Sequence, residues 1–109
     1  MSGLTSLQRL LRYTAWADAR LYDALAAAPD GPLHAARPAG RGPRHTLAHM
    51  QRIDLVWQAH LEGRAHGFDS RQVDAPPSLE DLRREQRALD TWYVAYADGL
   101  APAALQQVV

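Results

Sequence analysis

Two histidines four residues apart, in the segment His45-Thr-Leu-Ala-His49, are the first side chains in this sequence that could do chemistry together. On a helix this spacing places both imidazoles on one face, about 6 Å apart along the axis, so both could reach one metal ion. Two histidines supply at most half of a tetrahedral shell. A metal site therefore needs further ligands elsewhere in the chain, and without them the pair is structural.

Two aspartates lie where apolar residues are expected. Asp18 projects from the centre of an apolar stripe of helical period, formed by Leu4, Leu11, Leu21 and Leu25. An unpaired buried carboxylate is costly, so Asp18 requires a partner: an imidazole, an arginine of the 37–44 segment or a metal, unless it is simply hydrated near a bundle end. Asp54, near the edge of the next apolar arc, has the same alternatives. With a metal, either could be a ligand, orient His49 or act as a general base.

Other candidate binding groups have simpler explanations. Arg37, Arg41 and Arg44 could clasp an anionic substrate, or could belong to a hydrated loop. Tyr93 or Tyr96 could line a pocket, although large aromatic side chains more often pack in small cores.

Composition excludes several classes of function. The 109 residues suit one domain, and twelve acidic residues balance twelve basic ones, so no charge footprint for nucleic acid or an anionic membrane surface is present. There is no cysteine, so any metal must be held by histidine and carboxylate groups. No apolar run approaches the roughly 20 residues of a membrane span, and no secretory signal is recognisable. We therefore expect a cytoplasmic protein.

The elements that must position these residues are helices. Apolar spacing and breaker residues predict an all-α, antiparallel up-down bundle in a single domain, with helices over about 4–28, 43–62 and 78–100. In the second helix the predicted buried arc comprises Met50, Ile53, Trp57 and Leu61. This arc directs His49 into the bundle and His45 towards its rim. His60 projects on nearly the same side as His49 but about 16 Å further along the axis, too far to share an ion.

Three segments together resemble the DinB (DNA-damage-inducible) family. They are LLRYTAWADARL at 10–21, TLAHMQRIDLVWQAHLEG at 46–63 and PSLEDL at 77–82. The resemblance implies a four-helix bundle, commonly a homodimer, with a divalent metal, Zn or Ni, held by three histidines near one end. One ligand matches His49, and the family's other two form a His-x-x-x-His pair on the fourth helix. Relatives include metal-dependent transferases that join small-molecule thiols such as bacillithiol to electrophilic substrates, and a thiol-dependent isomerase.

The sequence departs from this family in three places. Asp18 stands where the family's first helix often has Asn. After His49 the remaining histidines are His60 and His66, which are not four apart, so one metal ligand carries over instead of three. Gly42-Pro43-Arg44 also replaces the family's Gly-Ser-Ile-like turn. We therefore expect a DinB-type bundle whose fourth helix is missing, a domain incomplete at its C-terminus, and a metal site that can stand unoccupied.

Three hypotheses for function follow. The first is a metal-binding protein that acts as a thiol S-transferase or hydrolase-like enzyme, in which His49 binds the ion and a metal-bound thiolate is the nucleophile. The second is a non-catalytic interaction or dimerisation module, whose apolar groove a second subunit or a partner helix fills. In the third, His45 and His49 form a small self-contained site with Asp18 or Asp54.

Overall fold

The computed structural model describes residues 2–28, 42–68 and 76–106. Within these ranges the chain forms three α-helices, α1 (Gly3–Ala27), α2 (Pro43–Leu61) and α3 (Leu79–Asp98), followed by the short 3-10 helix η2 (Pro102–Gln106). No strand occurs in the described ranges. The predicted all-α class is confirmed, and the three predicted helices agree with the observed ones to within two residues at each end.

Local chemistry explains where the helices begin. The hydroxyl of Ser2 accepts a hydrogen bond from the backbone N–H of Thr5 at the start of α1. In the same way the hydroxyl of Ser78 accepts from the backbone N–H of Asp81 at the start of α3. Each serine satisfies a backbone donor that the first helical turn leaves without a partner. At α2 the first residue is Pro43, whose missing N–H costs nothing at this position.

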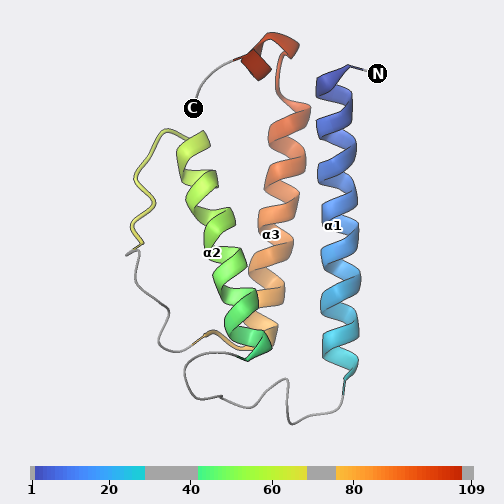
Figure 1. Ribbon diagram of the computed structural model, residues 1–109, viewed down its shortest axis with the longest axis vertical. Helices are drawn as coiled ribbons and strands as arrows, with labels where there is room; N and C mark the ends of the chain where they lie inside the picture. Colours follow the sequence, from blue (N-terminus) through green and yellow to red (C-terminus); the bar gives the residue numbers. More distant parts are fainter. Residues whose placement is uncertain (1, 29–41, 69–75, 107–109) are drawn as a thin grey trace.

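The three helices lie in a single layer with α3 in the middle (Figure 1). α1 runs antiparallel to α3, because Gln8 contacts the carbonyl of Ala97 while the start of α3 lies near the end of α1. α2 runs parallel to α3 (Figure 1): Gln51 bonds to Leu82, and Asp54, later on α2, accepts through its carbonyl from the hydroxyl of Tyr93, later on α3. The predicted alternation of up and down is therefore wrong for α2 and α3, which point the same way.

The buried apolar core of this layer is small. Among the described residues it consists of Tyr22, Ala48, Ala59, Leu79, Leu82, Leu89 and Ala97. Three of these are alanines, which contribute little apolar area. A single layer of helices has two broad faces, and the elements in residues 2–28, 42–68 and 76–106 form no second layer over either of them. None of the described helices is both long and apolar enough to cross a membrane.

The predicted buried arc of α2 is the main error in the expected packing. Met50, Ile53 and Trp57 remain 56%, 45% and 52% exposed, and α2 instead turns Ala48, Gln51 and Ala59 towards the interior. The alanine side chains are small and add little buried apolar area to this contact. Leu61, the fourth residue of the predicted arc, is partly buried, and the described elements leave the other three residues of the arc exposed.

Candidate functional site

One aspartate from each helix meets a single amide in the middle of the layer. The side-chain nitrogen of Gln86 lies 3.4 Å from a carboxyl oxygen of Asp18, 3.2 Å from one of Asp54 and 3.0 Å from one of Asp90. Asp18 comes from α1, Asp54 from α2, and Asp90 lies one turn after Gln86 on α3. We call these three aspartates, with Gln86, the acid cluster. It ties all three helices together at one point.

A second glutamine fixes which way the Gln86 amide points. The side-chain nitrogen of Gln51 donates to the carbonyl oxygen of Leu82 at 2.8 Å and to the side-chain oxygen of Gln86 at 3.3 Å. Because the Gln86 oxygen accepts from Gln51, its nitrogen must face the aspartates. Gln51 and Gln86 are 6% and 7% exposed, so water has little access to this chain of hydrogen bonds.

Burial moves the pKa of one member of the acid cluster, Asp90, into the neutral range. Burial raises the pKa of Asp90 from 3.8 to about 7, assisted by a hydrogen bond with Asp18 and by the charges of Asp18 and Asp54, while the Gln86 amide opposes the shift. Burial likewise raises the pKa of Asp54, and the charge of Asp18 adds to the effect. Asp90 is only 8% exposed, which explains why its charged form is disfavoured.

Two tyrosines border the acid cluster and stay protonated. Burial, followed by the charges of the aspartates, raises the pKa of both Tyr22 and Tyr93 to about 12. The Tyr93 hydroxyl donates to the backbone carbonyl of Asp54 at 2.5 Å. Tyr93 is not among the residues that line the cleft described next, and the suggestion that Tyr93 or Tyr96 lines a pocket stays a prediction.

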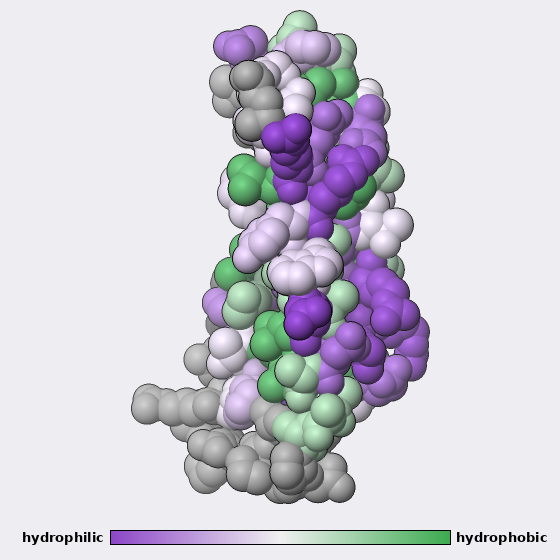
Figure 2. All heavy atoms as spheres, turned by 90° about the vertical axis from the view of Figure 1, so that its right-hand side faces the viewer, coloured by the Kyte–Doolittle hydropathy of each residue, from purple (hydrophilic) through white to green (hydrophobic). Residues whose placement is uncertain are grey.

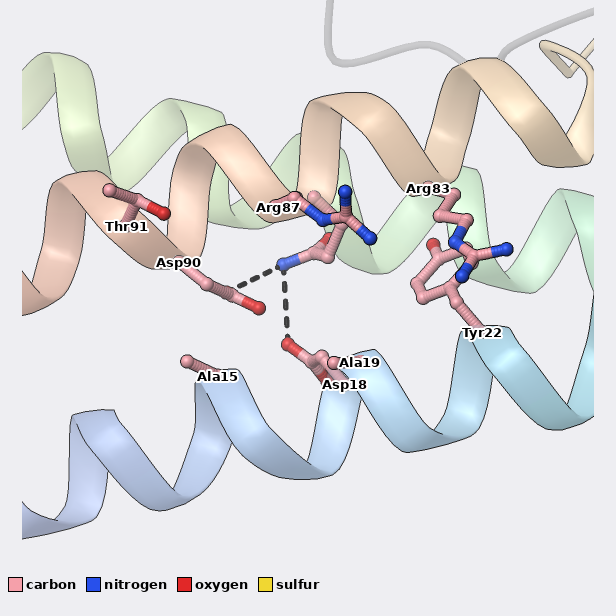
Figure 3. Close-up of a pocket in the computed structure, with 9 residues that line it drawn as sticks. Ala15, Asp18, Ala19, Tyr22, Arg83, Arg87, Asp90 and Thr91 are labelled. Atoms are coloured by element: carbon pink, nitrogen blue, oxygen red, sulfur yellow. Dashed lines mark hydrogen bonds between the residues drawn. The ribbon is translucent and has the colours of Figure 1, made fainter.

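A cleft of about 80 Å³ opens beside the acid cluster between α1 and α3. In Figure 3 Asp18 and Asp90 approach one another from the two helices, and the Gln86 amide nitrogen lies within hydrogen-bonding distance of both. The lining residues are Ala15, Asp18, Ala19, Tyr22, Arg83, Gln86, Arg87, Asp90 and Thr91. Arg83 is engaged by Asp23 across the two helices. The space is large enough for a few water molecules and too small for a drug-sized ligand.

Proton exchange is the chemistry that the described residues lining the cleft offer. Asp90 could take up or release a proton near neutral pH, as a general acid or base must. No cysteine exists in the chain, and the only hydroxyl groups lining the cleft are those of Tyr22 and Thr91. No histidine lines the cleft, so neither hydroxyl has an imidazole there to activate it.

The structure separates the residues predicted to form a metal site. Asp18 and Asp54 come together at Gln86, whereas the side chain of His49 is exposed on α2. His45 is partly buried, and its Nδ1 has no hydrogen-bond partner. Across residues 2–28, 42–68 and 76–106, no group of three or more histidine and carboxylate side chains is arranged to hold a metal. These residues therefore do not fit the expected ion by themselves.

The partner of the two anomalous aspartates is none of those expected. Each was expected either to meet an imidazole, an arginine or a metal, or to be hydrated near a bundle end, and both lie within hydrogen-bonding distance of the amide of Gln86. Arg37 and Arg41 lie outside the described residues. Asp90 was not singled out in the sequence, although its position four residues after Gln86 places the two on one side of α3.

Comparison of the chain with models of known protein families, with characterised proteins and with solved structures finds no significant match. The resemblance to the DinB family therefore stays a hypothesis. The functional assignment has to come from the geometry of the chain itself.

Proposed function

We propose that this chain is a helical association module that docks a second copy of itself. The observation that carries the proposal is a set of large, exposed and uncharged side chains on α1 and α2. We call the surface they form the open face, and it comprises Leu10 and Leu21 of α1 with Met50, Ile53 and Trp57 of α2. The residues on each helix form an apolar stripe along it, and the acid cluster lies between the stripe of α1 and the stripe of α2.

On α1 the apolar and charged residues are separated around the helix. Leu10 and Leu21 are 63% and 44% exposed. At 3.6 residues per turn they share an arc of about 80° with the uncharged residues Thr14, Ala17 and Ala24. The charged residues Arg9, Arg12, Arg20 and Asp23 occupy another arc. Figure 2, which looks onto α1, shows hydrophobic side chains gathered towards one long edge and hydrophilic ones over the other.

On α2 the exposed stripe is equally free of charge. Met50, Ile53 and Trp57 follow one another at spacings of three and four residues, so they share one side of the helix. Each leaves about half of its surface in water. Scattered exposed apolar residues need no explanation, but a contiguous stripe of large ones marks an interaction surface.

Both stripes belong to the same side of the layer. Around α1, Asp18 lies between the side that contacts α3 and the stripe of Leu10 and Leu21. Around α2, Asp54 lies between Gln51, which contacts α3, and the stripe from Met50 to Trp57. Because Asp18 and Asp54 both reach Gln86, they mark one side of α3. Each stripe continues beyond its aspartate on that side.

Charge and symmetry favour a second copy as the occupant. Twelve acidic and twelve basic residues give no net formal charge, so two copies do not repel one another over long range. Homo-oligomers with a two-fold axis are also the commonest assemblies.

Sedimentation equilibrium of the wild-type chain and two matched variants tests this proposal. Trp57→Glu puts a charge on the open face, while Trp16→Glu changes an equally exposed tryptophan among the charged residues of α1, where Arg20 stacks on its ring. We expect wild type and Trp16→Glu to be dimers and Trp57→Glu to be a monomer. A wild-type chain that stays monomeric at several hundred micromolar would rule the proposal out.

A metal-dependent thiol transferase is the second candidate, and the position of His49 favours it. His49 is exposed and precedes Ile53 by one turn, so docking on the open face would bring groups of the partner near it. The described residues do not supply the remaining ligands, and in this candidate function the partner provides them. Metal content of the purified protein, compared between wild type and His49→Ala, tests this candidate. Equal and negligible occupancy in both would exclude it.

A further inference from the structure

A second surface of α1 lies apart from the open face. Exposed side chains there follow one another at spacings of four, three and four residues, so they share an arc of about 60° around the helix. We call them the outer stripe: Arg9, Tyr13, Trp16 and Arg20. The centre of the outer stripe is about 90° around α1 from the apolar stripe that belongs to the open face. A partner on one surface therefore leaves the other accessible.

The middle of the outer stripe is aromatic and open to water. Tyr13 and Trp16 are 62% and 56% exposed, and their ring centroids are 5.8 Å apart with the ring planes inclined by 33°. Figure 2 looks onto α1 and shows side chains of intermediate hydropathy in the middle of the surface, with hydrophilic ones above and below. Tyrosine and tryptophan bury large areas with few rotatable bonds, and they are enriched among the residues that dominate binding energy at protein interfaces.

The two ends of the outer stripe are positive. Arg9 and Arg20 are about 16 Å apart along the axis, one on each side of the aromatic pair. Arg12, which lies beside the outer stripe, is already paired with Asp98 of α3. No carboxylate among the described residues forms an ion pair with Arg9 or Arg20. The outer stripe therefore carries two exposed cations that can still pair with the carboxylates of another molecule.

The contact between Arg20 and Trp16 prepares the arginine for a carboxylate. The Cζ atom of Arg20 lies over the Trp16 ring, 5.0 Å from its centroid. A guanidinium held over an aromatic ring keeps the N–H donors of its own plane, which match the two oxygens of a carboxylate. The contact also restricts the rotamers of Arg20, so less conformational entropy is lost when a carboxylate binds.

We propose that the outer stripe docks an acidic amphipathic helix of another protein. Spacings of four, three and four residues are those at which two helices interdigitate along a common seam. The matching helix carries large apolar residues against Tyr13 and Trp16, and one carboxylate against each terminal arginine. This inference does not depend on self-association, because the outer stripe and the open face occupy different arcs of α1.

Charge spacing favours a helix over single-stranded nucleic acid as the partner. Both are negative, and both can pack on aromatic rings. A nucleic-acid strand has a phosphate at every nucleotide and is bound by a groove of cations that follows its backbone. In the outer stripe the aromatic pair separates the two free cations by about 16 Å. An acidic helix needs carboxylates only at these two points.

Fluorescence anisotropy of a labelled synthetic peptide tests the proposal. The peptide is a helix of about 20 residues with glutamate at positions i and i+11 and leucine at i+4 and i+7. Alanine and glutamine fill the other positions. We expect saturable binding to the wild-type chain and weaker binding of a second peptide with glutamine in place of glutamate, because each exposed ion pair contributes up to about fivefold. High salt should reduce this difference between the two peptides.

Three variants, each confirmed as folded by circular dichroism, locate the bound peptide. Trp16→Ala should weaken binding of the glutamate peptide at least about tenfold, as the loss of a central aromatic anchor does. The double variant Arg9→Gln with Arg20→Gln should bind the glutamate and glutamine peptides equally well. Trp57→Glu, on the open face, is the matched control and should keep the affinity of the wild type.

Four results would overturn the proposal. The first is the absence of saturable binding of the glutamate peptide at about 1 mM. The second is an affinity that is the same for wild type and the double arginine variant. The third is tighter binding of an oligothymidylate of about 20 nucleotides, or of anionic phospholipid vesicles, than of the glutamate peptide. The fourth is loss of peptide binding in Trp57→Glu, which would place the peptide on the open face.

Discussion

Replacing Asp90 with asparagine should change how folding stability depends on pH. Burial raises the pKa of Asp90 from 3.8 to about 7, so the folded state binds this proton more tightly than the unfolded state does. The resulting stability is fully present below about pH 4 and is lost as the pH rises through 7. A shift of about three units corresponds to about 4 kcal/mol as an upper bound, at roughly 1.4 kcal/mol per unit. Asparagine is neutral at every pH and does not incur this loss.

Urea unfolding followed by circular dichroism measures the effect directly. The protein concentration is kept low, so that association contributes little. We expect the wild type to lose stability between pH 5 and pH 8, and Asp90→Asn to lose much less. At pH 8 the variant should therefore be the more stable of the two, by up to about 4 kcal/mol. Equal stabilities at pH 8, or a wild-type stability that does not change between pH 5 and 8, would refute the reasoning.

Two further predictions concern apolar packing. Trp57 is 52% exposed, so about 130 Å² of a side chain of roughly 250 Å² is in contact with water. Burying all of this area on docking would contribute about 3 kcal/mol per subunit to the free energy of association. Trp57→Glu should therefore raise the dissociation constant at least a hundredfold, and a change below threefold in sedimentation equilibrium would place Trp57 outside the interface. Leu82 is 1% exposed, so Leu82→Ala should lower the free energy of unfolding by about 2–5 kcal/mol in urea titrations, with a loss below 1 kcal/mol contradicting its role in the core.

The helices could be predicted from the sequence because their signals are local. Ser78 and Pro43 mark the starts of α3 and α2 through backbone hydrogen bonding and fixed dihedral angles, which depend only on neighbouring residues. The relative direction of α2 and α3 could not be predicted in this way. A connection of more than a dozen residues can join helices that run parallel or antiparallel, and the choice depends on long-range pairs such as Gln51 with Leu82.

The candidate site was predicted in part. Asp18 and Asp54 stood out because a carboxylate next to an apolar stripe needs a partner, and both are indeed hydrogen-bonded. Their partner, Gln86, could not be identified, because its amide reaches them only once α3 lies between α1 and α2. His49 was expected to face the interior, and it is exposed because nothing among the described residues covers the apolar arc beside it. The spacing of apolar residues shows which side of a helix is apolar, but it does not show which element packs against that side.

Thiol labelling on the open face tests most directly the central claim that the chain self-associates through this face. Because the sequence has no cysteine, each introduced thiol is the only one that reacts. Thr14→Cys places one thiol among the apolar residues of α1, and Arg20→Cys places one on the charged side of the same helix. Self-association through the open face predicts that alkylation at position 14 slows as the protein concentration rises, while alkylation at position 20 does not. Equal rates at both positions across all concentrations would contradict docking on this face.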